Sequence, residues 1–243
     1  MNKFIFMDNR MREFERNYLK NMGYELIEIP TNNNIYNEIS SHVDIFVTKI
    51  NDKLFVEPTL YHWLQKKGIN NKNIISGCFS VKGKYPFDIP YNLCQIGNNV
   101  IHNFKYTDPI ILDYINEQGL NKININQGYS NCSIAVISEN SAIVTDKKIA
   151  KKLENNNIDV LCISKKLDIK LLTDLNEYSN MKGFIGGCIS RLQNKIIFWG
   201  DLNNIKDKKN IIEFIDKKNL ELIEFKKSEL IDYGGVVDII LKL

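Results

Sequence analysis

Two cysteines and one histidine have side chains that could carry nucleophilic or acid–base chemistry. Cys132 follows small polar residues and precedes an apolar run, and Cys188 follows two glycines in a similar position. A cysteine attacks only as a thiolate, so it needs a neighbour that lowers its pKa. His42 is the candidate general acid and base. A free cysteine is also a common small hydrophobic core residue, so both interpretations stay open for Cys132 and Cys188.

Other residues are suited to binding a polar or cationic ligand. His42 and Asp44 are two positions apart, so in a strand both would point to the same face. The irregular segment 77–92 is stiffened by two prolines and could place polar groups rigidly. The candidate ligand-binding residues are His42, Asp44, Asp88, Tyr91, Asn92, Cys132, Gly187 and Cys188. The alternatives are a histidine–carboxylate pair that only caps loops, a loop that only seals the fold, and a glycine needed for tight packing.

The cysteine and histidine spacings predict no metal site and no cofactor. The five cysteines are odd in number, and no two are spaced as Cys-x-x-Cys. The three histidines share no ligand spacing. A disulfide framework is therefore not expected.

These candidates are distributed over a repeat of about fifty residues, whose order is strand, strand, helix, strand. An acidic or amide residue closes the second strand of each unit, and it suits the N-cap of the following helix. These strand-end residues are Asp8, Glu57, Asn103, Asp146 and Asp201. The helices are expected at 12–22, 60–67, 109–118, 147–155 and 210–218 from the spacing of apolar residues.

Glycine or asparagine follows most of the expected helices. These residues tolerate the left-handed conformation that often ends a helix. The positions are Gly23, Gly68, Gly119, the run 155–157 and Asn219. Each of them lies between a helix and the third strand of its unit, and the chain then continues into the next unit.

The last strand, 236–241, has no second strand after it, and we expect it to pair with the first strand, 3–7. The fold class is therefore α/β: a pseudo-five-fold ring closed by pairing of the terminal strands, which leaves no open sheet edge there. Residues 1–243 are expected to form a single domain. Its repeats are expected at about 232–243 with 1–30, 41–78, 90–126, 130–164 and 183–226.

Composition limits the class of protein. The chain has 243 residues, a formal net charge of +3 and no basic block, so nucleic acid is not an expected partner. No apolar run approaches the eighteen or so residues of a membrane-spanning helix. The N-terminal stretch MNKFIFMDNR is too short, and reaches the acidic Asp8 too soon, to match a signal peptide. We expect a cytoplasmic protein with no membrane partner and a possible small polar ligand; the sequence does not determine the oligomeric state.

The segments SSHVDIFV, YPFDIPYN, QGYSNCSIAVIS, GFIGGCIS and LIDYGGVVDIIL resemble an uncharacterised clostridial family. That family is classed with the guanidino-group-modifying enzymes, whose fold, the pentein fold, is a five-bladed α/β propeller. The resemblance covers nearly the whole chain and implies this fold. Enzymes of the fold use a cysteine thiolate to attack the guanidinium carbon, a histidine to carry protons, and carboxylates to hold the guanidinium.

The resemblance also implies that two of these three parts are missing. The position that corresponds to the cysteine of the dimethylarginine hydrolases falls near Gly234 or Gly235. The position that corresponds to their histidine falls near Ser130 to Cys132. Asp44 matches an acidic residue. We therefore expect no arginine or dimethylarginine hydrolase activity, and predict binding of a small polar or cationic, guanidino-like ligand in a central cavity. The alternatives are a thiol-dependent hydrolase or transferase with a rearranged Cys/His/Asp site, and a scaffold that binds no small ligand.

Overall fold

The computed structural model describes residues 2–172 and 181–241. The described strands form five sheets of three strands each. The middle strand of each sheet pairs antiparallel with an inner strand and parallel with an outer strand. From inner to outer strand, the sheets are β15 (Val237–Leu241), β1 (Asn2–Asp8) and β2 (Glu25–Ile29); β3 (Val47–Ile50), β4 (Lys53–Val56) and β5 (Ile74–Ser76); β6 (Cys94–Ile96), β7 (Asn99–His102) and β8 (Asn121–Asn124); β9 (Ile134–Ser138), β10 (Ser141–Val144) and β11 (Asp159–Cys162); and β12 (Ile189–Leu192), β13 (Lys195–Phe198) and β14 (Glu221–Glu224).

One helix connects the middle strand of each sheet to its outer strand. These helices are α1 (Glu13–Asn21), α3 (Pro58–Lys66), α4 (Pro109–Glu117), α6 (Lys147–Glu154) and α7 (Lys208–Asp216). Four of them bury apolar residues at helical spacing, such as Leu60 and Leu64 of α3, or Ile211 and Ile215 of α7, whereas α1 buries Leu19 and Glu15. The middle strands are almost entirely buried, because they are covered by a strand on each side and by the helix.

The sequence correctly predicted where these helices end. Gly23, Gly68, Gly119, Asn157 and Asn219 all have positive φ, between 56° and 85°. A residue without a Cβ, or with a short amide side chain, adopts this conformation at little cost. The chain can therefore turn back at each of these positions and enter the outer strand.

The N-cap prediction holds for only some of the strand-end residues. Glu57 accepts a hydrogen bond from Leu60 N at 2.9 Å, and Asp146 accepts one from Lys148 N at 2.7 Å. Asp201 caps a short 3-10 helix, 202–204, and not the predicted helix, because the N-cap residue of α7 is Asp207. The prediction is wrong for Asn103, because 3-10 helix η2 (Phe104–Tyr106) follows it and Asp108 caps α4. It is also wrong for Asp8, which accepts hydrogen bonds from Arg10, forming an ion pair of 2.8 Å.

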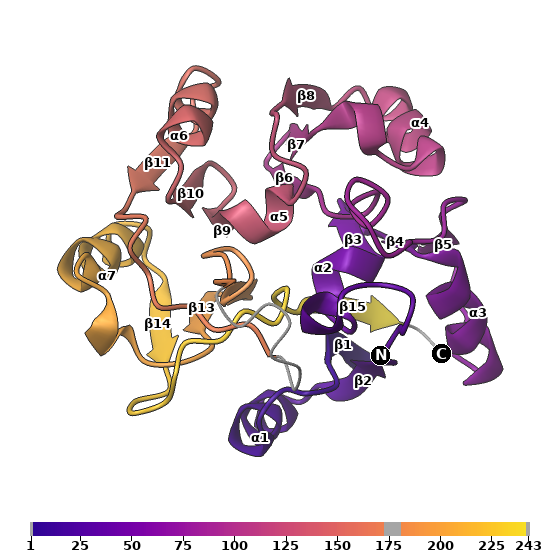
Figure 1. Ribbon diagram of the computed structural model, residues 1–243, viewed down its shortest axis with the longest axis horizontal. Coiled ribbons are helices and arrows are strands. Elements are labelled where there is room, and N and C mark those ends of the chain that lie inside the picture. Colours follow the sequence, from indigo (N-terminus) through magenta and orange to yellow (C-terminus); the bar gives the residue numbers. More distant parts are fainter. Residues whose placement is uncertain (1, 173–180, 242–243) are drawn as a thin grey trace.

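The predicted pairing of the terminal strands is confirmed. Strands β1 and β15 are antiparallel, in a register that runs from Asn2 opposite Leu241 to Phe6 opposite Val237. Figure 1 shows the indigo and yellow ends of the chain meeting in this sheet. Residues nearly the whole chain length apart thus complete one unit.

The residues before two of the inner strands are helical, which corrects the expectation for His42 and Asp44. They do not lie in a strand: His42 is the N-cap of α2 (Val43–Phe46), and strand β3 begins only at Val47. Likewise α5 (Ser130–Ser133) precedes β9. Polar residues such as Ser, Asn and Asp compete with a strand ladder by bonding nearby backbone groups, which explains the turns. Short 3-10 helix η1 (Asn37–Ile39) lies just upstream of His42.

These turns bring the inner ends of the sheets together. Inner strands β15, β3, β6, β9 and β12 contact one another in that order. Val236 N, just before β15, donates a hydrogen bond of 3.0 Å to Ser190 Oγ of β12. Figure 1 shows the five units following one another in chain order around the middle of the molecule. Across residues 2–172 and 181–241, every helix is too short or too polar to cross a membrane.

Candidate functional site

The Cys132 thiol and the Asp44 carboxylate form a buried pair in the middle of the molecule. Cys132 Sγ donates to Asp44 Oδ2 at 2.8 Å, and the two residues are 5% and 1% exposed. Asn92 Nδ2 lies 3.2 Å from Cys132 Sγ and 3.2 Å from the Asp44 carbonyl oxygen. Asn131 Nδ2 donates to Asp44 Oδ2 at 3.3 Å. Turns preceding three different inner strands therefore supply this pair and its amide donors.

His42 interacts with a second buried acid, Asp232. His42 Nε2 lies 2.7 Å from the Asp232 carbonyl oxygen and 3.5 Å from Asp232 Oδ1. The carbonyl can only accept, so Nε2 carries the proton and donates it. Phe184 N donates to Asp232 Oδ2 at 2.8 Å, and Gly234 N donates to Asp232 Oδ1 at 2.9 Å. Asp232 is thus held rigidly next to the imidazole.

Two glycines allow the Cys132–Asp44 pair and the His42–Asp232 pair to lie close together. A Cβ on Gly234, whose φ is +67°, would lie 2.5 Å from Asp44 Oδ1 and 2.9 Å from His42 Cβ. A Cβ on Gly187 would lie 1.8 Å from Asp232 Oδ1. Any larger residue at either position would displace a carboxylate. We call His42, Asp44, Asn92, Asn131, Cys132 and Asp232 the central cluster.

Burial controls the ionisation of the central cluster. Burial raises the pKa of Asp44, and the hydrogen bonds from Cys132, Asn131 and Asn92 oppose that rise. Burial raises the pKa of Asp232 to about 6, with His42 opposing the rise. Burial lowers the pKa of His42. Burial, and then the negative charge of Asp44, raise the pKa of Cys132 well above its usual value, so its thiol stays protonated near neutral pH.

Two acceptor atoms in the central cluster have no donor within the described part of the chain. They are Asp44 Oδ1 and His42 Nδ1, and both are shielded from solvent. A buried acceptor left without a partner is costly. Asp44 also has no lysine or arginine within ion-pair distance among the described residues. The cluster therefore has more acceptors than donors.

The predicted site residues separate into those inside this cluster and those outside it. Cys188 lies beside it: its Sγ donates to the Ile185 carbonyl at 3.2 Å, and burial followed by the charge of Asp232 raises its pKa. Asp88 accepts a hydrogen bond from Tyr129, the residue before α5. Tyr91 points elsewhere and donates to the Phe79 carbonyl at 2.7 Å.

Asp232 was missed by the sequence reasoning. Its signal was its position two residues before the Gly234–Gly235 pair, in the sequence IDYGG. A carboxylate placed next to a glycine pair can accept the backbone N–H that follows, as Asp232 does from Gly234. Among the described residues, no group of three or more His, Cys, Asp or Glu side chains has the arrangement of a metal site.

Solved structures with the same fold include three kinds of guanidino-modifying protein. DDAH from Pseudomonas aeruginosa, a cysteine-to-serine mutant complexed with citrulline, matches with a TM-score of 0.57 and 9% identity over 92% of both chains. Substrate-bound agmatine deiminase of C. jejuni matches with a TM-score of 0.54 and 12% identity, over 96% of this chain and 81% of that one. Inosamine-phosphate amidinotransferase from Streptomyces griseus matches with a TM-score of 0.53 and 8% identity, over 93% and 78%.

These similarities establish the α/β pentein fold predicted from the sequence. Identities this low say nothing of the reaction, because fold and function separate readily. No curated protein matches the sequence. A family model matches residues 6–237, and the chain thus belongs to the family of unknown function DUF6873.

Proposed function

We propose that the protein binds a small, donor-rich cation of the guanidino type in the central cluster, without standard guanidine hydrolase chemistry. The observation that carries this proposal is the surplus of buried acceptors: Asp44 Oδ1 and His42 Nδ1 have no donor among the described residues. The Asp232 carboxylate adjoins them. A ligand that completes this cluster must bring N–H groups and positive charge.

A guanidinium group has these properties. It carries several N–H donors in a rigid plane, no acceptor, and a charge that persists at every accessible pH. Charge-assisted hydrogen bonds to carboxylates are roughly twice as strong as neutral ones. The solved relatives named above include proteins described with citrulline and as an agmatine deiminase. The central cluster is buried, so entry requires a local movement of the turns around it.

The absence of the standard reaction is supported by the residues at the positions that correspond to the hydrolase cysteine and histidine. Gly234 and Gly235 offer no nucleophile, and a side chain at Gly234 would collide with Asp44 and His42. At the position that corresponds to the hydrolase histidine, Cys132 donates a hydrogen bond to the Asp44 carboxylate and not to a group that would favour its thiolate. A thiol in this environment is a poor nucleophile.

The alternative function, a rearranged thiol enzyme, is favoured by one contact. Cys132 Sγ and Asp44 are 2.8 Å apart in the same cluster as His42, so a ligand that displaced Asp44 could bring thiol and imidazole together. Alkylation with iodoacetamide, followed by peptide mass spectrometry, tests this. We expect exposed Cys78 and Cys162 to react at least 100-fold faster than Cys132 in the folded protein. Faster alkylation of Cys132 than of the exposed thiols would favour the enzyme.

We also propose that residues 1–243 form one domain of five repeats closed into a pseudo-five-fold ring. The pairing of β1 with β15 and the succession of contacts between inner strands support this arrangement. The repeat boundaries given above place one sheet in each unit.

The ligand proposal is tested by isothermal titration calorimetry with agmatine, arginine and methylated arginines. We expect at least one of these compounds to bind, and Asp44→Asn and Asp232→Asn each to weaken binding by about 10- to 100-fold, the loss of one charge-assisted contact. 1,6-Diaminohexane, a diammonium dication of similar length without a guanidino group, should bind more weakly than agmatine. A parallel assay for citrulline and ammonia should detect no turnover.

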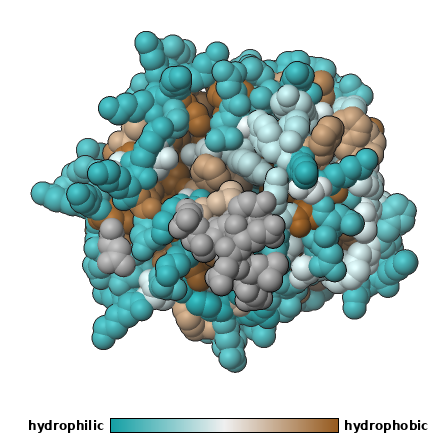
Figure 2. Space-filling model, viewed as in Figure 1, coloured by the Kyte–Doolittle hydropathy of each residue, from teal (hydrophilic) through white to brown (hydrophobic). Residues whose placement is uncertain are grey.

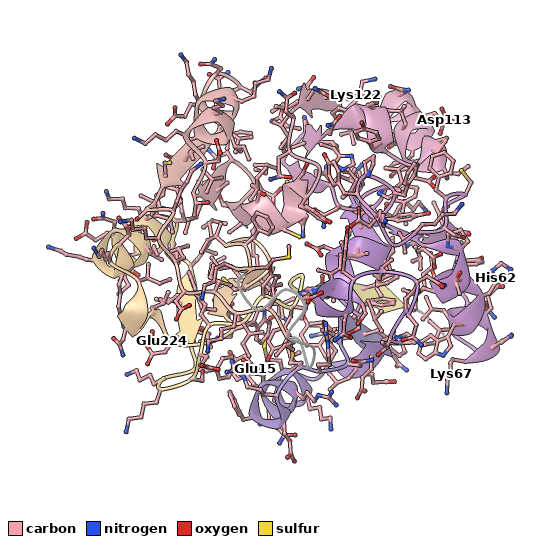
Figure 3. All side chains as sticks on the ribbon, viewed as in Figure 1. Glu15, His62, Lys67, Asp113, Lys122 and Glu224 are labelled. Carbon is pink, nitrogen blue, oxygen red and sulfur yellow. The ribbon has the colours of Figure 1, made fainter. Side chains whose placement is uncertain are left out.

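The matched control is Asp113→Asn. Asp113 is exposed, and Figure 3 shows it on α4 at the edge of the molecule, away from the middle. This variant should bind like the wild-type protein. The proposal fails if no guanidino compound binds, or if Asp44→Asn and Asp113→Asn bind equally well. Thermal melting of each variant without ligand separates lost binding from lost folding.

A further inference from the structure

A cavity of about 640 Å³ lies beside α6, outside the central cluster. Its lining includes Lys148 and Lys152 of α6, Lys165 after β11, Lys182 before β12, and Ser133 at the end of α5. Isoleucine and leucine side chains also line it. Figure 2 shows hydrophobic atoms in a hollow on this face, surrounded by hydrophilic ones. The cavity thus combines an apolar surface with a basic rim.

The cavity lining has an excess of positive charge. Four lysines line it against one carboxylate, Asp146. Lys165 pairs with Asp146 at 2.9 Å, and Lys182 pairs with Asp168 at 2.6 Å. Lys148 and Lys152 have no ion-pair partner within residues 2–172 and 181–241.

Those two lysines can act on the same ligand. Lys148 and Lys152 lie one helical turn apart, so their side chains lie on one side of α6. A second cavity, of about 560 Å³, shares Asp146, Lys148 and Lys165 with the first and adds Lys147. The basic surface therefore continues around the start of α6.

A buried hydroxyl provides an independent indication of a ligand. Ser133 is 7% exposed and lines the cavity, and its Oγ has no hydrogen-bond partner among the described residues. The backbone N–H groups at the start of α6 are not available to a ligand, because Asp146 Oδ1 accepts from Lys148 N at 2.7 Å and Ile149 N at 3.3 Å. An anion would therefore be held by the lysine ammonium groups, and by the Ser133 hydroxyl once its side chain rotates, because Ser133 Oγ is shielded from solvent.

We propose that this cavity binds a small organic phosphate, with its apolar body on the aliphatic lining and its phosphate near Lys148 and Lys152. The volume is typical of small-molecule sites. Lysine is a common phosphate ligand, and the excess of positive charge suits a dianion. The site is separate from the central cluster: Gly183 and Phe184 line the cavity, while Phe184 N holds Asp232 on the other side.

The probe for this site is phenyl phosphate, measured by calorimetry at low ionic strength. We expect it to bind at least 10-fold more tightly than inorganic phosphate or phenol, because only phenyl phosphate uses both parts of the cavity. Lys148→Gln and Lys152→Gln should each weaken it by about 10-fold, the loss of one charged contact. Ser133→Ala should weaken it several-fold without lowering the melting temperature, since that hydroxyl has no partner to lose.

The matched control is Lys67→Gln, an exposed lysine that Figure 3 places at the end of α3 on the opposite side. It should leave phenyl phosphate binding unchanged, and so should Asp44→Asn, which distinguishes this site from the cation site. Three results would overturn the proposal. They are equal affinity for phenyl phosphate and inorganic phosphate, unchanged binding in the Lys148→Gln, Lys152→Gln double variant, and benzoate binding as tight as phenyl phosphate.

Discussion

The Asp232 carboxyl accepts two backbone N–H groups and lies beside His42 Nε2, yet burial raises its pKa to about 6. A cation binds the ionised form of this carboxyl, so binding requires the proton to leave. Below pH 6 each further unit of acidity should weaken cation affinity by up to 10-fold. Asp44, whose pKa is also raised, acts in the same direction.

Affinity for agmatine should therefore increase as the pH rises from about 5 to about 7. The two charges of agmatine stay constant over this range, because amines and guanidines lose protons only above pH 10. In the Asp232→Asn variant the affinity should rise less with pH, because one carboxyl fewer must release its proton before the cation binds. Calorimetry across this range measures both. Affinity that is flat, or that falls with rising pH, would contradict the assignment of Asp232 as a ligand group.

Gly187 provides a second test at the level of a single residue. An alanine Cβ there would lie 1.8 Å from Asp232 Oδ1. Gly187→Ala should lower the free energy of unfolding by about 1–3 kcal/mol, the cost of overpacking a core, and should also weaken agmatine binding. Gly119→Ala, which has open space at its Cβ but a φ of +63°, should cost roughly 1–2 kcal/mol and leave binding unchanged. Urea unfolding and calorimetry distinguish the two effects.

The site residues show what the sequence could and could not predict at this scale. His42, Asp44, Asn92 and Cys132 were predicted because each lies just before an inner strand. The strand conformation predicted for His42 and Asp44 was wrong, because strand-like alternation and a single helical turn look alike over a few residues. Tertiary pairing of Cys132 with Asp44, 88 positions apart, has no local signal.

At the scale of elements, Ser190 joins two sheets. Its Oγ accepts from Trp199 Nε1 at 3.0 Å and from Val236 N at 3.0 Å, next to β15. Ser190→Ala leaves two donors without their acceptor, so we expect a loss of about 2–4 kcal/mol in the free energy of unfolding. Ser138→Ala, whose hydroxyl interacts only within its own β-turn, should cost less than about 1 kcal/mol. Equal costs in urea unfolding would show that Ser190 does not join the sheets.

Helix ends were predictable because their determinants are local. The five left-handed residues after the helices follow from residue type alone, because they are glycines, which have no Cβ, or asparagines, which have a short amide side chain. The caps were less predictable: Asp8 follows a strand like the others, but the neighbouring Arg10 recruits its carboxylate. Arg10 also donates to the carbonyl oxygens of Asn37 and Glu38, and these contacts across the fold are not encoded in a short-range pattern.

At the scale of the whole molecule, the pairing of β1 with β15 brings the two terminal strands together, so the chain can be joined there and opened at an exposed loop instead. A circular permutant that joins residues 243 and 1 through a short glycine linker, with new ends between Asn155 and Asn156, should fold. Both of these asparagines are exposed. Its melting temperature should lie within about 10 °C of the wild-type value. Deleting 237–241 instead should abolish cooperative melting, because β1 would lose its antiparallel partner.

The same pairing has a consequence for synthesis on the ribosome. The sheet that contains the first strand cannot close until residues 237–241 have been made, and Asp232 and Gly234 also arrive late. During translation, one edge of β1 therefore stays open to wrong partners. The hydrogen bond between His42 and Asp232 in the central cluster can likewise form only after most of the chain has been synthesised.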